Sequence, residues 1–432
     1  MGLGVLEDTK LDHVPGTVLL NDHAAHTEDI TGALKHGRGR DAEIVLSPQP
    51  SEDPNDPLNW STLEKESIIW ILCLGAMLHA GVNGPFLNAS YFEISALLGR
   101  PLPTVVLASG YNLLAAGCSG PFVCAFSRKY GKRHVFLISS LFDIIGTAIG
   151  EANVSFKYLL VARVVQGFST SAYESLIIAA VGDLYFVHQR GLRVAIINFI
   201  LNAASSLASI ICGQVFQSLG YLWLFHLFQI FCVLQFVLVF LFCPETTYIR
   251  DERYNTDTIL DEKYVELAHI EGGKSEVSEQ LGRVGTTDVP RKKTFVQELA
   301  LFSGVYSRDS LFKFLVGPFL TLFNPAACYA VITSGLLNSW YVGGAIILSG
   351  IFSGPPWMFN AAQIGYLGAG PVRATLRRNP VVLPKKLTPD LQFIGGMLGS
   401  ILVAVGSDPI IKLMTKRNNG KSSPHPAGSA RS

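Results

Sequence analysis

Six long apolar runs place the strongest constraint on what this chain can fold into. They lie at about 67–89, 104–126, 135–151, 158–181, 194–217 and 221–243. A helix needs roughly 20 consecutive apolar residues to cross about 30 Å of hydrocarbon. Composition agrees with this pattern, because 49% of the residues are hydrophobic and only 16% are charged. We therefore predict an all-α polytopic membrane protein.

The polar stretches between the runs divide the chain into parts. We expect a polar cytosolic arm, a six-helix transmembrane bundle, a cytosolic linker, a partial second bundle and a polar tail, at residues 1–66, 67–243, 244–310, 311–411 and 412–432. A connection as long as the one over 244–310 is unusual between neighbouring helices. Its length and mixed charge favour a linker between two bundles.

Basic residues predict the orientation, since short cytosolic loops are enriched in lysine and arginine. The even-numbered loops of the first bundle carry most of them: Arg128, Lys129, Lys132, Arg133, Arg190 and Arg193. We therefore place these loops and the N-terminus in the cytosol. The same rule places Lys313 and Lys412 on that side, so the apolar run 311–352 is expected to cross once, broken near Asn324 and Pro325.

The segment 372–392 conflicts with a membrane span. It brings basic residues and helix-breaking prolines between two apolar fragments, 361–371 and 393–406, each too short to cross. One interpretation is a translated, unspliced intron, because codons for Val372-Arg373 can begin an intron and a codon for Gln392 can end one. The other is a genuine basic insertion that leaves the membrane. We favour the intron, since an insertion would expose irregular backbone to lipid.

Arg163 and Glu174 are ionisable residues within the fourth apolar run. At 100° per residue, Glu174 lies only about 20° around the helix from Arg163 and roughly 16 Å along it. Gln166 and Gly167 fall on the same side. Charges at membrane depth are costly unless they face a cavity or partners, so we predict that this side lines a central cavity, where Glu174 attracts a cation or proton. A structural charge pair with another helix is the alternative.

Other polar residues at membrane depth are candidates to line the same cavity: Asn83, Tyr111, Tyr173, Asn198 and Asn202. The seven cysteines lie within or at the edges of apolar runs, without ligand-like spacing, and are expected to be small core residues. We predict no metal, no cofactor and no nucleic-acid partner. Because no phosphate-binding loop or nucleophile arrangement stands out, we do not expect an enzyme.

Several short motifs resemble fungal major facilitator superfamily transporters of the drug:proton antiporter group, which includes multidrug and polyamine exporters. They are DPNDPLNW (53–60), SRKYGKRHVFL (127–137), RVVQGF (163–168), ESLIIAAVGDLYFVHQRGLR (174–193) and PETTYIR (244–250). The resemblance covers about residues 53–420. It implies a fold of twelve helices in two bundles that alternate access to a central site. The chain supplies the first six and helices seven and eight, so we expect it to be truncated after helix eight.

The resemblance also implies roles for loop residues. The family's gating loop reads Gly-x-x-x-Asp-Arg/Lys-x-Gly-Arg/Lys-Arg/Lys, and Lys129, Gly131, Lys132 and Arg133 match it, whereas Arg128 replaces the acidic residue. Simple cytosolic anchoring by these cations is an equal alternative. Asp183 and Arg190 resemble the family's cytosolic charge network, with loop solvation as the alternative, and Asp408 remains from the second gating loop. Arg163 resembles a residue linked to proton transfer. The family's Gly-Pro antiporter motif is missing from helix five, where Gly213 remains.

These observations lead to one expected function and one alternative. The expected function is proton-coupled, alternating-access transport of a small organic solute, a drug-like cation or polyamine, by a monomer in the plasma membrane. Its partners would be the substrate, protons and the lipid bilayer. The alternative is a truncated, non-transporting membrane protein or a solute sensor. The residues alone establish only a multi-span protein with ionisable groups at depth.

Overall fold

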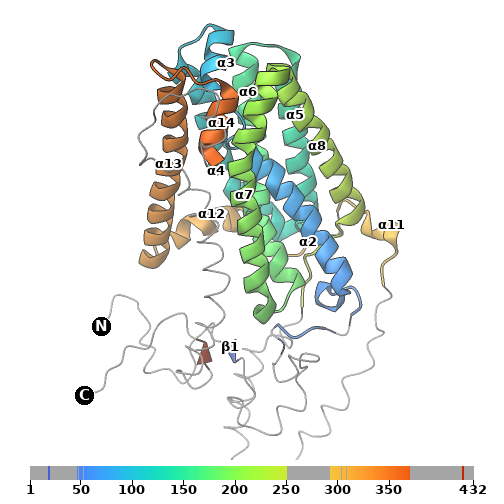
Figure 1. Cartoon of the computed structure of the whole chain (residues 1–432). Coiled ribbons are helices and arrows are strands. Elements are labelled where there is room, and N and C mark those ends of the chain that lie inside the picture. The colour runs from blue at the N-terminus through green and yellow to red at the C-terminus, as the bar shows by residue number, and fades with distance from the viewer. Residues whose placement is uncertain are drawn as a thin grey trace, which may run out of the picture.

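The computed structural model describes residues 53–250, 292–302, 304–307 and 309–369, with short pieces at 18–19, 46, 48–51 and 421–422. Asp408, the interruption predicted over 372–392 and the central part of the expected linker lie outside these residues. Figure 1 shows the described residues as a bundle of long, roughly aligned helices.

Six helices between residues 62 and 242 are long and apolar enough to cross a membrane. The first combines α2 with a π-helical turn, η5, and the other five are continuous. Their bounds are Thr62–Ala76 for α2, Met77–Val82 for η5, Leu102–Tyr130 for α4, Arg133–Ala152 for α5, Phe156–Leu184 for α6, Val187–Leu219 for α7 and Tyr221–Phe242 for α8. The predicted all-α fold with a six-helix N-terminal bundle is confirmed.

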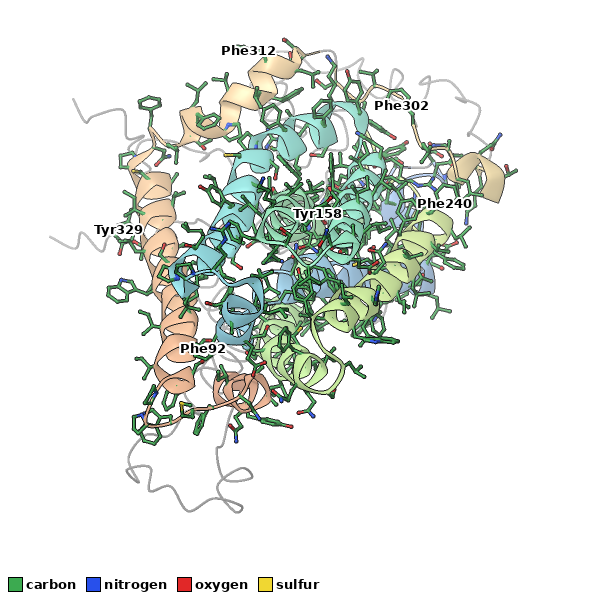
Figure 2. All side chains as sticks on the ribbon, turned by 90° about the horizontal axis from the view of Figure 1, so that it is seen from above. Phe92, Tyr158, Phe240, Phe302, Phe312 and Tyr329 are labelled. Atoms are coloured by element: carbon green, nitrogen blue, oxygen red, sulfur yellow. The ribbon has the colours of Figure 1, made fainter. Side chains whose placement is uncertain are left out.

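The remaining elements are shorter or lie outside this bundle. They are the 3₁₀ helix η4 (Pro57–Asn59), α3 (Tyr91–Leu98), α11 (Phe295–Glu298), α12 (Leu311–Thr321), α13 (Pro325–Ser353), α14 (Ala361–Ala369) and two antiparallel two-residue strands, β1 (Val18–Leu19) and β2 (Lys421–Ser422). Of these, α13 is also long and apolar enough to cross. Figure 2 shows α13 at the rim, with Tyr329 pointing away from the bundle.

Local sequence signals explain where two of the spanning helices begin. The Ser61 hydroxyl accepts a hydrogen bond from the backbone N–H of Glu64, and the Glu64 carboxylate accepts one from Ser61 N–H, which forms a capping box. Asn324 caps α13 by accepting from Ala326 N–H, and Pro325 occupies the first helical position. The apolar run 311–352 therefore contains two helices, with the boundary at Asn324.

The bundle is organised around α6, which packs against α4, α5 and α2. Two apolar clusters fill it, one around Leu72 and Ile177, the other around Phe86 and Phe225. Outside it, α14 packs closely on α7. A Cβ on Gly213 of α7 would lie 2.5 Å from the carbonyl oxygen of Ala361, so only glycine permits this approach.

Candidate functional site

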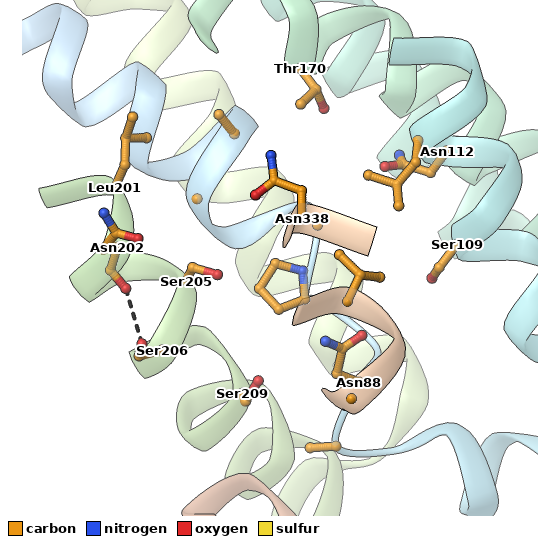
Figure 3. A pocket seen from close by; sticks show the side chains of 18 of the residues that line it. Asn88, Ser109, Asn112, Thr170, Leu201, Asn202, Ser205, Ser206, Ser209 and Asn338 are labelled. Atoms are coloured by element: carbon orange, nitrogen blue, oxygen red, sulfur yellow. Dashed lines mark hydrogen bonds between the residues drawn. The ribbon is translucent and has the colours of Figure 1, made fainter. Parts of the chain in front are cut away.

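A cavity of about 1000 Å³ lies between the six-helix bundle and α13. Its wall comes from η5 and the segment after it, α4, α6, α7, α13 and α14. Figure 3 shows Asn202, Ser205 and Ser209 along α7 on one side and Ser109 and Asn112 on the other, with Asn338 of α13 between them. Both parts of the chain therefore contribute hydroxyl and amide groups to one space.

Glu174 of α6 lines this cavity. It is the one charged residue in the lining formed by the described part of the chain. Its side chain is exposed, and within that part of the chain no hydrogen bond or ion pair engages its carboxylate. Thr170, one turn earlier, also lines the cavity. An unpaired carboxylate among neutral polar groups favours a positively charged ligand.

Arg163 lies deeper in the bundle and is completely buried. Its Nη1 donates to Asn83 Oδ1 at 2.6 Å and to Gln166 Oε1 at 3.0 Å, and its Nη2 donates to the carbonyl oxygen of Asn83 at 2.7 Å. The guanidinium lies 6.0 Å from the centre of the Phe86 ring. Its hydrogen-bond partners are all neutral, so they satisfy the donors without cancelling the charge.

The structure separates the residues that helical periodicity placed on one side of α6. Glu174 lines the cavity, whereas Arg163 and Gln166 are enclosed by neighbouring helices, and Gly167 packs against Asn112 of α4. The reason is that α4 and η5 close over the deeper part of α6 but leave the turn around Glu174 open.

Of the other predicted cavity residues, one lines the cavity and the others do not. Asn202 lines the cavity and donates to the carbonyl oxygen of Asn198, which is itself exposed on α7. Asn83 is fully buried and donates to Thr170 Oγ1 at 3.2 Å. Tyr173 is fully buried inside the bundle, and Tyr111 is 44% exposed on α4; neither is part of the lining.

A buried polar cluster that the sequence analysis did not predict lies behind the cavity. His79 of η5 pairs through Nδ1 with Asp143 of α5, and both side chains are fully buried. The Nε2 atom of His79 lies 3.0 Å from Gln235 Oε1 of α8, and the imidazole stacks on the Tyr173 ring at 4.5 Å. An ionisable residue within an apolar run was the available signal, but the pairing across three helices was not visible in it.

The loop 128–133, between α4 and α5, is held from several sides. Lys132 pairs with Asp183 at the end of α6 and donates to the carbonyl oxygen of Ala179 at 3.1 Å. Arg190 does not bind Asp183; it donates to the carbonyl oxygens of Gly182 and Tyr185. The predicted charge network therefore contains one direct ion pair, and Arg190 braces the same turn through its backbone.

Glu245, after α8, provides a carboxylate for this loop. It accepts hydrogen bonds from the backbone N–H groups of Lys132 at 2.9 Å and Arg133 at 3.1 Å. Gly131 has a φ of 99°, and a Cβ there would lie 2.4 Å from a Glu245 oxygen. Glycine is thus required both by the backbone conformation and by the approach of the carboxylate.

The segment before α12 docks on the same loop. Lys129 donates to the carbonyl oxygen of Asp309, and its own carbonyl accepts from Tyr306 N–H. Arg133 donates to the carbonyl oxygens of Glu298, Ala300 and Phe240. Arg128, which stands at the acidic position of the gating motif, is exposed. The loop therefore joins the first bundle to the chain that leads into the second part.

A second contact on this side involves the motif before α2. Asp56 is fully buried and accepts from Arg250 Nη2 at 2.8 Å and from Leu58 N–H at 3.0 Å. Burial alone would raise the pKa of Asp56, but the hydrogen bonds and charge of Arg250 with the backbone donors hold it below the usual value. The DPNDPLNW and PETTYIR motifs are therefore in direct contact.

Comparison with known proteins supports the family. The Major Facilitator Superfamily model matches residues 68–406. An uncharacterized MFS-type transporter of Schizosaccharomyces pombe is 27% identical over 56% of this chain and 41% of its own length. The MFS antiporter QDR3 of Candida albicans is 29% identical over 49% of this chain and 30% of its own length. A peptide transporter POT structure aligns with a TM-score of 0.44 at 14% identity, over 82% of this chain and 68% of that chain.

The match over most of the chain identifies it as a member of the Major Facilitator Superfamily. The chain spans about two-fifths, or less, of the length of the first relatives it matches. What those relatives carry out as whole proteins is therefore considered only as a proposal.

Proposed function

We propose that the protein transports a small organic cation, drug-like or polyamine, across a membrane by proton-coupled alternating access. The observation that carries this proposal is the unpaired carboxylate of Glu174 in a polar cavity of about 1000 Å³. A volume of this order accommodates a small organic molecule. Both the six-helix bundle and α13 line the cavity, as expected for a site between moving halves.

In this proposal the positive charge of the cation lies against Glu174, and Asn202, Asn338 and Thr170 orient the molecule. Loop 128–133, with Asp183 and Arg190, is the cytosolic gate, because it contacts both the bundle and the segment before α12. The N-terminus is cytosolic, the protein acts as a monomer, and the plasma membrane is its proposed location. The sensor alternative gains no support from a cavity lined by both parts.

The test is uptake of tetraphenylphosphonium and spermidine into proteoliposomes that contain the chain, driven by a pH gradient. Glu174→Gln removes the charge but keeps the size of the side chain. We expect uptake to fall about tenfold, the effect of about 1.4 kcal/mol of lost attraction. The matched control is Glu151→Gln on α5, whose carboxylate pairs with His226 outside the cavity lining.

Two results would contradict the proposal. Uptake by Glu174→Gln at the wild-type rate would remove the carboxylate from cation binding. Absence of uptake of both cations by the folded wild-type chain would reject cation transport for this chain.

A further inference from the structure

We propose that His79 and Asp143 together form the proton-binding site that exchanges with the transported cation. This inference rests on the proposed function, because it names the groups that carry the coupling ion. It concerns a site inside the first bundle, distinct from the cavity and from Arg163. Four features support it: the donors and acceptors around the pair, its charge surroundings, its contact with the cavity wall and the helix geometry at His79.

The hydrogen-bond partners around the pair can accommodate one additional proton. Nδ1 of His79 faces Asp143 Oδ2, and Nε2 faces Gln235 Oε1, so both ring nitrogens face oxygen acceptors. A neutral imidazole has only one N–H. The arrangement is complete when the pair holds a second hydrogen, either on the ring or on the carboxyl group. The site thus has a defined place for the incoming proton.

Gln235 can also serve the pair after the proton has left. Its Nε2 donates to the Tyr173 hydroxyl at 2.8 Å. Rotating the amide by 180° exchanges its oxygen and nitrogen, so that the nitrogen donates to Nε2 of His79 and the oxygen accepts from Tyr173. The Nε2 atom of His79 therefore has a partner in both protonation states, and the change requires no helix movement.

The surroundings of Asp143 favour neutralisation of its charge. The side chain is fully buried, and its Oδ1 atom has no hydrogen-bond partner among the described residues. The second oxygen is 3.5 Å from Cys232 Sγ, a weak donor. A buried carboxylate with one oxygen that lacks a partner is costly as an anion. Uptake of one proton changes the charge of the pair from −1 to zero.

Four ionisable groups on the neighbouring helices influence this proton. Cys232 of α8 and Tyr173 of α6 contact the pair directly, and both are neutral in their usual forms. Arg163 of α6 interacts electrostatically with Asp143 and opposes protonation. Glu174, further along α6 in the cavity, has the opposite sign. A cation bound at Glu174 adds a second positive charge and would favour release of the proton. Exchange of a cation for a proton requires this direction of coupling.

The pair is connected to the cavity through one turn of helix. The carbonyl oxygen of His79 accepts a hydrogen bond at 3.0 Å from Thr170, which lines the cavity. Ala80, Gly81 and Gly84 line the cavity from the same segment, while the His79 side chain points into the bundle. A ligand that moves this turn therefore moves both sites.

That turn is π-helical over Met77–Val82. Single π-helical turns inside longer helices often mark functional sites, because the wider turn re-aims a side chain. Here it directs His79 toward Asp143 while the following residues face the cavity. The geometry is specific to the segment that joins the two sites.

A metal ion fits this cluster less well than a proton. His79, Asp143 and Cys232 place donor atoms within 4.8 Å of one another. A closed structural metal site takes four such ligands, and the described residues bring three here. Their atoms are already turned toward one another, so a metal would have to displace the His79–Asp143 hydrogen bond.

The test measures proton release on cation binding, without transport. Tetraphenylphosphonium is titrated by calorimetry into the chain in nanodiscs, in two buffers with different ionisation enthalpies. For the wild type we expect release of about one proton per bound cation, as linkage between coupled ligands requires. His79→Gln and Asp143→Asn should lose this release while still binding the cation. Unchanged release in both variants would overturn the inference.

His226→Gln is the matched control, since His226 of α8 also pairs with a carboxylate of α5, that of Glu151 at 3.2 Å, but outside the buried cluster. It should release the proton as the wild type does. A purely structural role for His79 would lower thermal stability without changing the proton count, so melting temperatures are measured for all three variants.

A second measurement separates failure of this inference from failure of the proposed function. Infrared difference spectra between pH 5 and pH 9 are recorded without any cation. If the wild type binds no cation, the proposed function fails, and these spectra alone test the pair. We expect imidazole and carboxyl bands that change together in the wild type and in His226→Gln. Their absence from the wild type would overturn the inference, also where the His79 and Asp143 variants do not fold.

Discussion

The first bundle stabilises charge in two different ways at two depths. In its centre, Arg163 is fully buried and its hydrogen-bond partners are neutral amide and carbonyl groups. At the end that carries loop 128–133, opposite charges meet directly, as in Asp56 with Arg250 and Lys132 with Asp183. The charge of Arg163 is therefore not cancelled by a direct ionic contact, whereas the charges of Asp56 and Lys132 are cancelled within pairs.

This difference suggests a division of work. Direct ion pairs at the end that carries loop 128–133 hold the motifs before α2 and after α8 together and fix the loop between α4 and α5. Arg163, whose hydrogen-bond partners are neutral, remains sensitive to a nearby proton or cation, and it acts electrostatically on Asp143 of the buried pair with His79. The same bundle thus combines an anchored end with a responsive centre.

The largest expected effect comes from removing the central cation. Arg163→Ala would leave oxygens of Asn83 and Gln166 unpaired inside the bundle, which costs about 2–3 kcal/mol of unfolding free energy. The measurement is thermal unfolding in nanodiscs, with Arg128→Ala on the exposed loop position as the control. An Arg163→Ala protein as stable as the control would contradict the stabilising role of the hydrogen bonds between Arg163 and its neutral partners.

A smaller effect is expected from acid at the end that carries loop 128–133. Because the folded-state pKa of Asp56 is lowered, its contribution to stability is present above the unfolded-state value near about 4 and is lost as pH falls through the folded-state pKa. Melting temperatures should therefore fall as the pH drops from about 5 to about 2, and Asp56→Asn should reduce the slope. Asp309→Asn, in an exposed pair, is the control. Equal slopes for Asp56→Asn and the wild type would contradict the assignment.

The smallest expected effect is the coupling between Lys132 and Asp183. Both side chains are partly exposed, so a double-mutant cycle with Lys132→Met and Asp183→Asn should give about 0.2–1 kcal/mol. The cycle is measured by unfolding of the four proteins. A coupling free energy of several kcal/mol would show that Lys132 and Asp183 behave as a buried pair, which would contradict the weak coupling expected for partly exposed groups.

The sequence predicted the six spans because lipid imposes length and hydrophobicity on a helix. It did not predict where the helices end. The apolar run at 194–217 belongs to a helix that begins at Val187 and includes Arg190 and Arg193. Those residues lie outside the expected hydrocarbon region. A helix can carry charged residues there, so the end of the apolar run does not mark the end of the helix. Apolar runs therefore locate membrane crossings better than helix boundaries.

The candidate site was predicted only in part, for a physical reason. Periodicity places Glu174 and Arg163 on one side of α6, but what covers that side changes along its length, from an open cavity at Glu174 to packed helices at Arg163. Likewise, His79 and Asp143 are 64 positions apart, and their pairing depends on how η5 packs against α5. Neighbouring helices decide these contacts, and a single helix pattern does not contain them.

The charges carried by α6 have a consequence for how the protein is made. The mean hydropathy of α6 is 1.2, which is half the value of 2.4 for α8, and α4 has the same value as α6. A helix with Arg163 and Glu174 is poorly retained by lipid alone. It must therefore leave the insertion machinery together with α4 and α5, whose surfaces cover it. Biogenesis of this bundle therefore includes a step in which α4, α5 and α6 assemble, in addition to the insertion of each helix. If these three helices paired late, the cell's quality-control machinery would recognise the unassembled protein.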